Sequence, residues 1–361
     1  MKNFKKILSV FIVLCLTALL FAGCAGSKND NTASPGNNQS TQKVDEKPDT
    51  SKKKIVLKIA NYFAESHPQN IALKEVFKPM VEKETNGAIE VQIYPNNQLG
   101  AEKEFIDGTK AGSIEMNIMG LMLSSQFPNL KVMEFPYLFD NPDQGYEILN
   151  DHIFDDVTKG LPEKAGLRIL GFNINGVRAI SNSKRPINSL EDCQGLKLRV
   201  PQVKHFVEMG KALGFSVVTM PYSEIFTALQ QGVVDGQENP PTTVLASGWY
   251  EAQKYIALTD HIVAYNAVTI NEKFYQSLSK EQQEIIKKAV KAFCDEELKL
   301  YKEGAQKDIE TLKEKGIVFT TPDREPFKQA VLPMYDTVLK EIPEAMELIK
   351  KIWDIQKKMG N

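Results

Sequence analysis

Strand-like and helix-like patterns alternate along the chain from about residue 55. The apolar run 55–60 predicts a strand, and apolar residues at helical spacing between Pro68 and Gly87 predict a helix with a kink at Pro79. A second strand is predicted where apolar and polar residues alternate at 88–94. A further helix and a buried strand follow at 102–111 and 114–119. This alternation favours parallel βαβ units.

The same order of elements returns in the second half of the chain. Strands are predicted at 196–200 and 215–219, and another begins at Val233. Helices at 201–214 and 222–231 connect them, and proline or glycine marks their ends as expected. Two α/β blocks in one chain predict an α/β protein of two lobes with a cleft between them.

A long helix is predicted from Ser279 to Gly316. Ser279 and Gln282 have the spacing of a capping box, and the apolar positions that follow repeat with the helical period. At 1.5 Å per residue this helix would span roughly 50 Å, which is longer than one small lobe is wide. A coiled coil is the alternative, but the apolar stripe does not keep a strict heptad. We therefore expect a strut that crosses both lobes, with Gly304 as the position for a bend.

The N-terminus has the pattern of a secretory signal peptide. Lysines among the first six residues precede the apolar run 7–21, and small residues lead to Cys24. A membrane-spanning helix is the alternative, but it needs about 20 apolar residues, and this run is shorter and ends in small residues. Phe21-Ala-Gly-Cys24 resembles the lipobox of bacterial lipoproteins, with Phe21 where leucine is usual. Cleavage before Cys24 and lipidation of its thiol are therefore predicted, and an ordinary signal peptide with a chance cysteine is the other interpretation.

Composition beyond the signal separates a polar tether from a globular region. Residues 25–54 have almost no apolar side chain, so we predict a disordered tether with a reach on the order of 30 Å. Loss of residues 1–23 removes three lysines and no acid, which shifts the formal net charge from −2 to −5. This mild balance, without a basic patch, argues against nucleic acid as a partner. Cys193 and Cys294 are expected to be unpaired thiols, although an oxidising compartment would permit a disulfide.

The sequence contains no motif of a common enzyme class. It lacks a Gly-x-Ser-x-Gly elbow, a phosphate-binding Gly-rich loop, and the His-Glu-x-x-His and Cys-x-x-Cys patterns. His205 and Glu208 lie one helical turn apart and could share a metal, but nothing nearby completes a ligand set. Asp235 and Glu238 could form an acid–base pair, but their setting is typical of a turn. We predict a protein without catalytic activity, metal or cofactor.

Two arginines in strand contexts are the candidates for binding chemistry. Arg199 is flanked by apolar residues in Leu196-Lys-Leu-Arg-Val200, and Arg178 follows a predicted strand at 168–173. A charged side chain in such a place is costly unless a partner meets it. That partner is either an acid of the same chain or the carboxylate of a ligand, which the planar guanidinium binds with two hydrogen bonds. The residues alone leave both interpretations open.

From about Leu57 to the C-terminus, the chain resembles the solute-binding proteins of tripartite ATP-independent (TRAP) transporters, in the dicarboxylate-binding, DctP-like group. The resemblance rests on six motifs that occur in the family's order and at its spacing. They are Tyr94-Pro-Asn-Asn-Gln-Leu-Gly100, Gly176-Val-Arg178, Arg185-Pro-Ile187, Gly195-Leu-Lys-Leu-Arg-Val-Pro201, Glu224-Ile-Phe-Thr-Ala-Leu-Gln230 and Val234-Asp-Gly-Gln-Glu-Asn-Pro240.

The resemblance implies a two-lobed fold of the periplasmic-binding-protein type, with hinge strands and a long C-terminal helix that spans both lobes. The expected division of the chain is a signal peptide at 1–23, a lipidated cysteine and tether at 24–54, a first lobe of 55–175 plus 265–304, and a second lobe of 176–264 plus 305–361.

The resemblance also assigns roles to individual residues. Arg199 is expected to form the main salt bridge with a ligand carboxylate, Arg178 a second carboxylate contact, Asn239 a polar contact and Tyr222 an apolar one. Weaker candidates for ligand contact are Glu102, Gln202, Tyr62 and His261. The chain departs from some relatives at Gly120, where those relatives carry a ligand-contacting acid, so their particular substrate does not carry over.

The implied function is capture of a small organic acid by hinge closure and its delivery to the membrane subunits of a TRAP transporter. The resemblance leaves a sugar acid, a C4-dicarboxylate and a keto acid open as ligands, and the polar candidates favour a uronate or aldonate. The protein is expected to be an exported monomer, held by its lipid alone on the outer face of the cytoplasmic membrane or in the periplasm. The alternatives are a sensory receptor for an organic acid and a surface hydrolase or lyase for acidic sugars.

Overall fold

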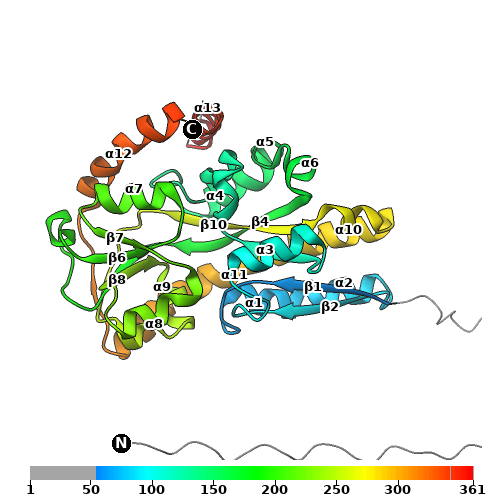
Figure 1. Cartoon of the computed structure of the whole chain (residues 1–361), viewed down its shortest axis with the longest axis horizontal. Coiled ribbons are helices and arrows are strands. Elements are labelled where there is room, and N and C mark those ends of the chain that lie inside the picture. The colour runs from blue at the N-terminus through cyan, green and yellow to red at the C-terminus, as the bar shows by residue number, and fades with distance from the viewer. Residues whose placement is uncertain (1–53, 342, 361) are drawn as a thin grey trace, which may run out of the picture. The chain divides into compact units, whose positions relative to one another are not determined.

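The computed structural model describes residues 54–341 and 343–360 (Figure 1). The predicted signal peptide, Cys24 and nearly all of the tether lie outside the described residues. Within the described part, no helix is both long and apolar enough to cross a membrane.

The first of two sheets holds five strands in the order β2-β1-β3-β10-β4. Strand β1 is parallel to β2 and β3, whereas β10 is antiparallel to both of its neighbours. The strands are β1 (Ile55–Ala60), β2 (Ile89–Tyr94), β3 (Met116–Met119), β4 (Leu167–Val177) and β10 (Val263–Asn271). The parallel units predicted at the start of the chain are therefore present, and the return strand β10 completes the sheet.

Pro79 interrupts the first long helical segment, where a kink was predicted. The segment consists of α1 (Pro68–Ala72), a π-helical turn at Leu73–Phe77 and α2 (Lys78–Glu84). Proline has no N–H to donate, and its ring crowds the preceding turn of a regular α-helix. The wider π-helical turn at Leu73–Phe77 lies just before Pro79, in the turn that the ring would crowd.

The remaining elements of the first half are short, apart from α3. They are α3 (Glu102–Ala111), 3-10 turns at Met122–Ser125 and Pro128–Glu134, α4 (Pro142–Glu147), a π-helical turn at Ile148–His152, α5 (Phe154–Thr158) and α6 (Leu161–Ala165).

The second sheet holds six strands in the order β11-β9-β5-β8-β6-β7. They are β5 (Ala179–Asn182), β6 (Lys197–Val200), β7 (Ser216–Thr219), β8 (Gly236–Asn239), β9 (Tyr255–Ala257) and β11 (Val318–Thr320). In Figure 1, α7 (Lys204–Ala212) lies above this sheet and α8 (Ile225–Gln230) and α9 (Pro241–Ala246) lie below it. Short 3-10 turns occupy Leu190–Cys193, Tyr222–Glu224 and Trp249–Ala252.

Strand β8 begins later than the sequence pattern predicted. Val233 and Val234 were expected to open the strand, but they follow the left-handed Gly232 in a turn, and the strand starts at Gly236. Val234 is buried in the core of the second sheet without being part of a strand. An apolar pair marks burial, and burial alone does not tell a strand from a turn that packs on the core.

Two strand connections lead from one sheet to the other. Strand β4 ends at Val177 in the first sheet, and β5 begins two residues later in the second. The segment 258–262 returns the chain from β9 to β10, and the backbone N–H of Arg178 donates to the carbonyl of Ile262 at 2.9 Å. These are the hinge strands that the resemblance implied.

The long helix α11 (Lys280–Glu314) also reaches both sheets, and it follows the short helix α10 (Glu272–Ser277). Ser279 caps it: the Ser279 hydroxyl accepts from the backbone N–H of Gln282, and the Gln282 side chain accepts from the N–H of Ser279. Val290 packs in the core of the first sheet, and Leu312 packs in that of the second. The helix continues through Gly304, so the predicted strut is confirmed.

The C-terminal helices pack on different parts of the molecule. Helix α12 (Arg324–Glu341) lies against α7, and α13 (Pro343–Met359) lies against the turn at 128–134. The Gln356 side chain of α13 donates to the carbonyl of Leu138 at 2.8 Å. The expected division into lobes stays a prediction, and α13 contacts residues that this division assigns to the other lobe.

Gly176 is expected to be essential to the crossing between β4 and β5. Its φ is +133°, and a Cβ atom placed there would lie 2.8 Å from the Tyr301 ring and 2.9 Å from Pro240. We expect Gly176→Ala to lower the free energy of unfolding by about 3 kcal/mol or more, because backbone strain and overpacking add. Urea denaturation followed by circular dichroism measures this change.

The matched control for that prediction is Gly87→Ala. Gly87 has a φ of +75°, but a Cβ atom added there would have no atom of the described residues within 4 Å. Only backbone strain remains, so we expect a loss of about 1–2 kcal/mol. Equal losses at the two positions would contradict the packing part of the argument.

Candidate functional site

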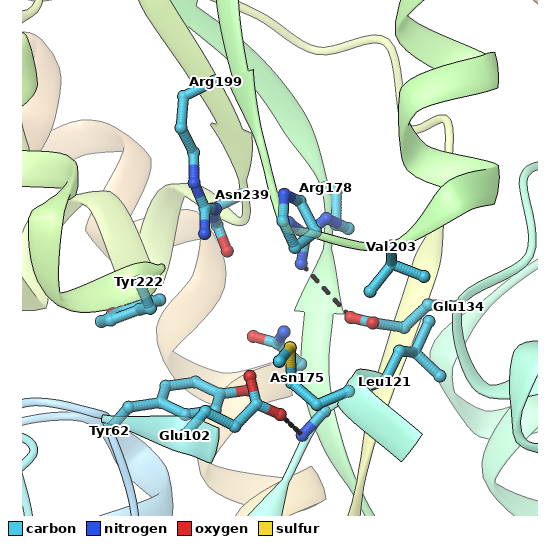
Figure 2. A pocket seen from close by; sticks show the side chains of 13 residues that line it. Tyr62, Glu102, Leu121, Glu134, Asn175, Arg178, Arg199, Val203, Tyr222 and Asn239 are labelled. Atoms are coloured by element: carbon cyan, nitrogen blue, oxygen red, sulfur yellow. Dashed lines mark hydrogen bonds and ion pairs between the residues drawn. The ribbon is translucent and has the colours of Figure 1, made fainter. Parts of the chain in front are cut away.

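A cavity lies where the carboxyl ends of several strands from both sheets meet (Figure 2). The first sheet and its loops contribute Tyr62, Glu102, Gly120, Leu121, Met122, Glu134 and Asn175. The second sheet, its loops and the connection between β4 and β5 contribute Arg178, Arg199, Pro201, Val203, Tyr222 and Asn239. Loops that follow parallel strands converge at one edge of a sheet, and ligand sites of α/β proteins are commonly found there.

Arg199 enters this cavity from β6 without a carboxylate partner. Its side chain is 3% exposed, and its Nε and Nη2 atoms donate to the carbonyl oxygen of Met220 at 3.1 and 2.7 Å. Within the described residues it forms no ion pair. Burial lowers the pKa of Arg199 to about 10, which leaves it positively charged at neutral pH. The internal salt bridge that the sequence left open is therefore not formed with any acid that the structure describes.

Arg178 is bound by the chain itself. Its Nε and Nη2 atoms donate to the two carboxylate oxygens of Glu238 at 2.5 and 2.8 Å, and Nη2 also donates to the Glu238 carbonyl at 2.7 Å. Its Nη1 atom lies 3.3 Å from the Glu134 carboxylate. Burial would raise the pKa of Glu238, but Arg178 and His261 outweigh it and lower that pKa to about 2. Arg178 lines the cavity, and its contact with a ligand stays a prediction.

Two of the weaker candidates do not line the cavity. His261 is fully buried behind Glu238, with its Nε2 atom 3.3 Å from the Glu238 carboxylate and its Nδ1 atom 2.8 Å from the Thr259 hydroxyl. Gln202 is exposed, one residue beyond the lining Pro201. The structure thus places His261 next to the hinge ion pair and Gln202 at the surface.

The aromatic and amide candidates do line the cavity. The rings of Tyr222 and Tyr62 come from opposite sheets and lie 4.7 Å apart, and Figure 2 shows both at the same side of the cavity. The Tyr222 hydroxyl bonds the Ser247 hydroxyl at 2.8 Å, and the Tyr62 hydroxyl donates to Asn266 at 2.9 Å. The Asn239 amide donates to Gln237 at 2.6 Å. These bonds hold the side chains in place.

Two carboxylates face the cavity from the first sheet's side. Glu102 begins α3, and its Oε1 atom accepts from the backbone N–H of Gly120 at 2.8 Å. Burial raises the pKa of Glu102 to about 7 despite that bond and the charge of Arg199. Burial also raises the pKa of Glu134 to about 8, against the attraction of Arg178. Both acids are therefore only partly ionised near neutral pH.

Sequence reasoning missed Glu134 and Asn175 as site residues. Glu134 lies within Val132-Met-Glu-Phe135, and both apolar ends of this run are buried. An acid inside an apolar run was a usable signal, because a buried carboxylate needs a special environment. Asn175 lies directly before the Gly176-Val-Arg178 motif, but only the packing of β4 shows that it lines the cavity.

The rival chemistry considered from the sequence finds no support in the geometry. His205 is buried and stacks on Phe135 at 5.9 Å, and no group of three potential metal ligands occurs among residues 54–341 and 343–360. Asp235 accepts from the backbone N–H of Lys197 and does not line the cavity, and Glu238 is bound to Arg178.

The two cysteines of the globular region, Cys193 and Cys294, are buried and unpaired, as expected.

Comparison with known proteins identifies the class to which this fold and site belong. The family model of the bacterial extracellular solute-binding proteins, family 7 (DctP), matches residues 59–341. The chain therefore belongs to this family, and its resemblance to TRAP-type solute-binding proteins is confirmed. A protein from Haemophilus influenzae is 37% identical over 303 residues, which cover 83% of this chain and 92% of that relative.

Named relatives and solved structures support the same class. The 2,3-diketo-L-gulonate-binding periplasmic protein YiaO of Escherichia coli is 29% identical over 81% of this chain and 90% of its own length. A TRAP periplasmic solute-binding protein from Haemophilus influenzae, solved with L-gulonate, is 36% identical with a TM-score of 0.80, over 83% of this chain and 99% of that one. The sugar acid binding protein DctPAm of Advenella mimigardefordensis, solved with galactonate, is 28% identical with a TM-score of 0.80, over 84% and 99%.

The raised pKa of Glu134 makes stability depend on pH. An unfolded glutamate has a pKa of about 4.3, so the folded protein holds a proton that the unfolded chain has lost between that value and about 8. The free energy of unfolding therefore falls as pH rises through this window. We expect Glu134 to cause a fall of about 2 kcal/mol between pH 6 and pH 8.5, and urea denaturation at both values measures it.

Glu134→Gln removes the titrating group while keeping its shape. This variant is expected to lose less stability than the wild type over the same pH range, although Glu102 still contributes part of the fall. The exposed Glu75 serves as the control position, because Glu75→Gln should leave the pH dependence as it is in the wild type. If the free energy of unfolding fell by the same amount in Glu134→Gln and in the wild type, Glu134 would not be the titrating group.

Proposed function

We propose that this protein captures a sugar acid outside the cytoplasm and delivers it to the membrane subunits of a TRAP transporter, with the ligand carboxylate bound to Arg199. The observation that carries this proposal is a buried guanidinium in a cavity, without any described acid to balance its charge. Burying a cation without a partner is costly, so the site is complete only when an anion binds.

The hydrogen bonds of Arg199 leave it free to bind a carboxylate. A guanidinium has five N–H donors, and only those on Nε and Nη2 contact the Met220 carbonyl. This bond to Met220 fixes the side chain on β6, and Figure 2 shows the guanidinium turned towards Asn239 and the interior of the cavity. A fixed guanidinium loses little further entropy when it binds a carboxylate.

The remaining contacts explain why binding favours closure of the hinge. Arg199, Tyr222 and Asn239 belong to the second sheet, whereas Tyr62, Glu102 and Asn175 belong to the first. A ligand that touches both sets binds the closed state more tightly than the open state, and this difference shifts the equilibrium towards closure.

Sugar acids are the ligand class that the relatives favour. Solved relatives contain L-gulonate, galactonate and D-glucuronate, and the sialic acid-binding protein SiaP of Vibrio cholerae is 34% identical over 71% of this chain. The cavity supports this class because it combines one free cation with hydroxyl, amide and carboxylate groups that bond to sugar hydroxyls.

Export and anchoring complete the proposal. The signal pattern and the Phe21-Ala-Gly-Cys24 motif support a lipoprotein held at the outer face of the cytoplasmic membrane, with residues 25–54 as its tether. The protein acts as a monomer without cofactor or catalytic step, since its task is reversible capture and transfer.

Replacement of Arg199 tests the carboxylate site. We expect Arg199→Ala to weaken binding of L-gulonate or galactonate at least tenfold, because the ligand carboxylate loses the guanidinium that has no acid partner among the described residues of the cavity lining. Arg199→Lys keeps the charge but loses the planar pair of donors, so its affinity should lie between that of the wild type and that of Arg199→Ala. Isothermal titration calorimetry measures all three proteins.

The control is Arg168→Ala, which removes a partly buried arginine that pairs with Glu272 and does not line the cavity. Its affinity for the sugar acid should match the wild type. Unchanged affinity in Arg199→Ala, for an acid that binds the wild type, would rule out the proposed site.

Replacement of Cys24 tests the anchor. In cells fed an alkyne-tagged fatty acid, the wild type should carry the label and sediment with membranes. Cys24→Ser should carry no label, because the position that takes the lipid has lost its thiol. Cys193→Ser, at a buried cysteine of the globular region, should be labelled like the wild type. Label retained in Cys24→Ser would show that the anchor lies elsewhere.

A further inference from the structure

The charges that line the cavity are separated between its two walls. Arg199 and Arg178 come from the second sheet and the crossing into it, whereas Glu102 and Glu134 come from the first sheet's side. Figure 2 shows the Glu102 carboxylate across the cavity from Arg199, and the Glu134 carboxylate directed towards Arg178. Among the described residues that line the cavity, no other side chain is basic.

Only one of the two arginines has charge to spare for a ligand. Arg178 forms a two-point ion pair with Glu238, so its charge is balanced before any ligand arrives. Glu134 has one further contact with it, at 3.3 Å, and Glu102 is held by the backbone N–H of Gly120. The cavity thus offers one free cation and two carboxylates: Glu134 shares Arg178 with Glu238, and Glu102 forms no ion pair within the described residues.

We propose that Glu102 and Glu134 are specificity-determining residues that restrict the site to acids with a single carboxylate and hydroxyl groups at the other end. This inference rests on the proposed function and specifies its ligand. Hydroxyl groups donate to carboxylates, so the polyol end of an aldonate or uronate suits this wall. A second ligand carboxylate would lie against these two carboxylates, and the nearby Arg178 is already paired with Glu238 and in contact with Glu134. Such a repulsive contact discriminates strongly between ligands.

The other ionisable groups around these carboxylates are Tyr62, Tyr222, Arg178, Arg199, Glu238, His205 and His261. Burial keeps the tyrosines protonated, because it raises their pKa values, and keeps His205 neutral, because it lowers its pKa to about 3. His261 contacts Glu238 rather than either carboxylate. Exclusion of a second carboxylate should therefore strengthen as Glu102 and Glu134 ionise above pH 8.

Matched pairs of sugar acids test this inference directly. Galactonate and galactarate, like L-gulonate and glucarate, share one carbon skeleton and differ only in a terminal CH₂OH or carboxylate. We expect the dicarboxylate of a pair to bind the wild type at least tenfold more weakly at pH 8.5, measured by calorimetry. At pH 6 the ratio of the two affinities, single carboxylate over dicarboxylate, should be smaller. Protons neutralise Glu102 and Glu134 at this pH, whereas both ligand carboxylates stay ionised.

Two variants assign the effect to its residues. Glu134→Gln and Glu102→Gln keep size and hydrogen-bonding capacity, and each should narrow the ratio at pH 8.5 at least threefold. The exposed Glu75→Gln should leave the ratio unchanged. The pH comparison on the wild type needs no variant, so the inference can be tested even if a variant folds poorly.

The outcomes separate this inference from the proposed function. If no sugar acid binds the wild type, the proposed function fails. If the single carboxylates bind but their dicarboxylate partners bind equally well at pH 8.5, only the specificity assignment is overturned. A selective wild type whose ratio changes neither with pH nor in the two variants would overturn it as well.

Discussion

The ion pair between Arg178 and Glu238 is the interaction on which the site depends. It lies at the crossing between β4 and β5, where the backbone N–H of Arg178 also bonds the return segment at Ile262. The two-point pair satisfies a guanidinium and a carboxylate that are both buried, and either one alone would be costly in this place. Because Arg178 is satisfied within the protein, Arg199 remains the cation that a ligand must neutralise.

The position of this pair links binding chemistry to the hinge of the fold. His261 contacts the same carboxylate from the segment that returns to β10, so both strand crossings meet at Glu238. The cavity lies beside them, and its walls come from the two sheets that the crossings join. A ligand bound between these walls therefore lies beside both connections between the sheets, where the proposed hinge closure would act.

The cavity has a positive end at Arg199 and an acidic end at Glu102 and Glu134. Arg199 suits one carboxylate, and Glu102 and Glu134 suit hydrogen-bond donors at the other end of the ligand. The family shares its fold across ligands with different head groups, from L-gulonate to sialic acid. The choice among such ligands therefore falls to the side chains that line the cavity, rather than to the scaffold.

The sequence by itself determined the βαβ order and the Ser279 cap of the long helix, which follow from local patterns, and six motifs in order gave the resemblance to the family. It placed Tyr222, Asn239, Tyr62 and Glu102 among the candidates, and all four line the cavity. Only the tertiary structure decided which arginine is paired, since Glu238 lies 60 residues from Arg178 along the chain. It also showed that Glu134 lines the cavity and that Gln202 and His261 do not. Val234 lies in a turn rather than in a strand. Pairing and burial depend on contacts between distant segments, and no local pattern encodes those contacts.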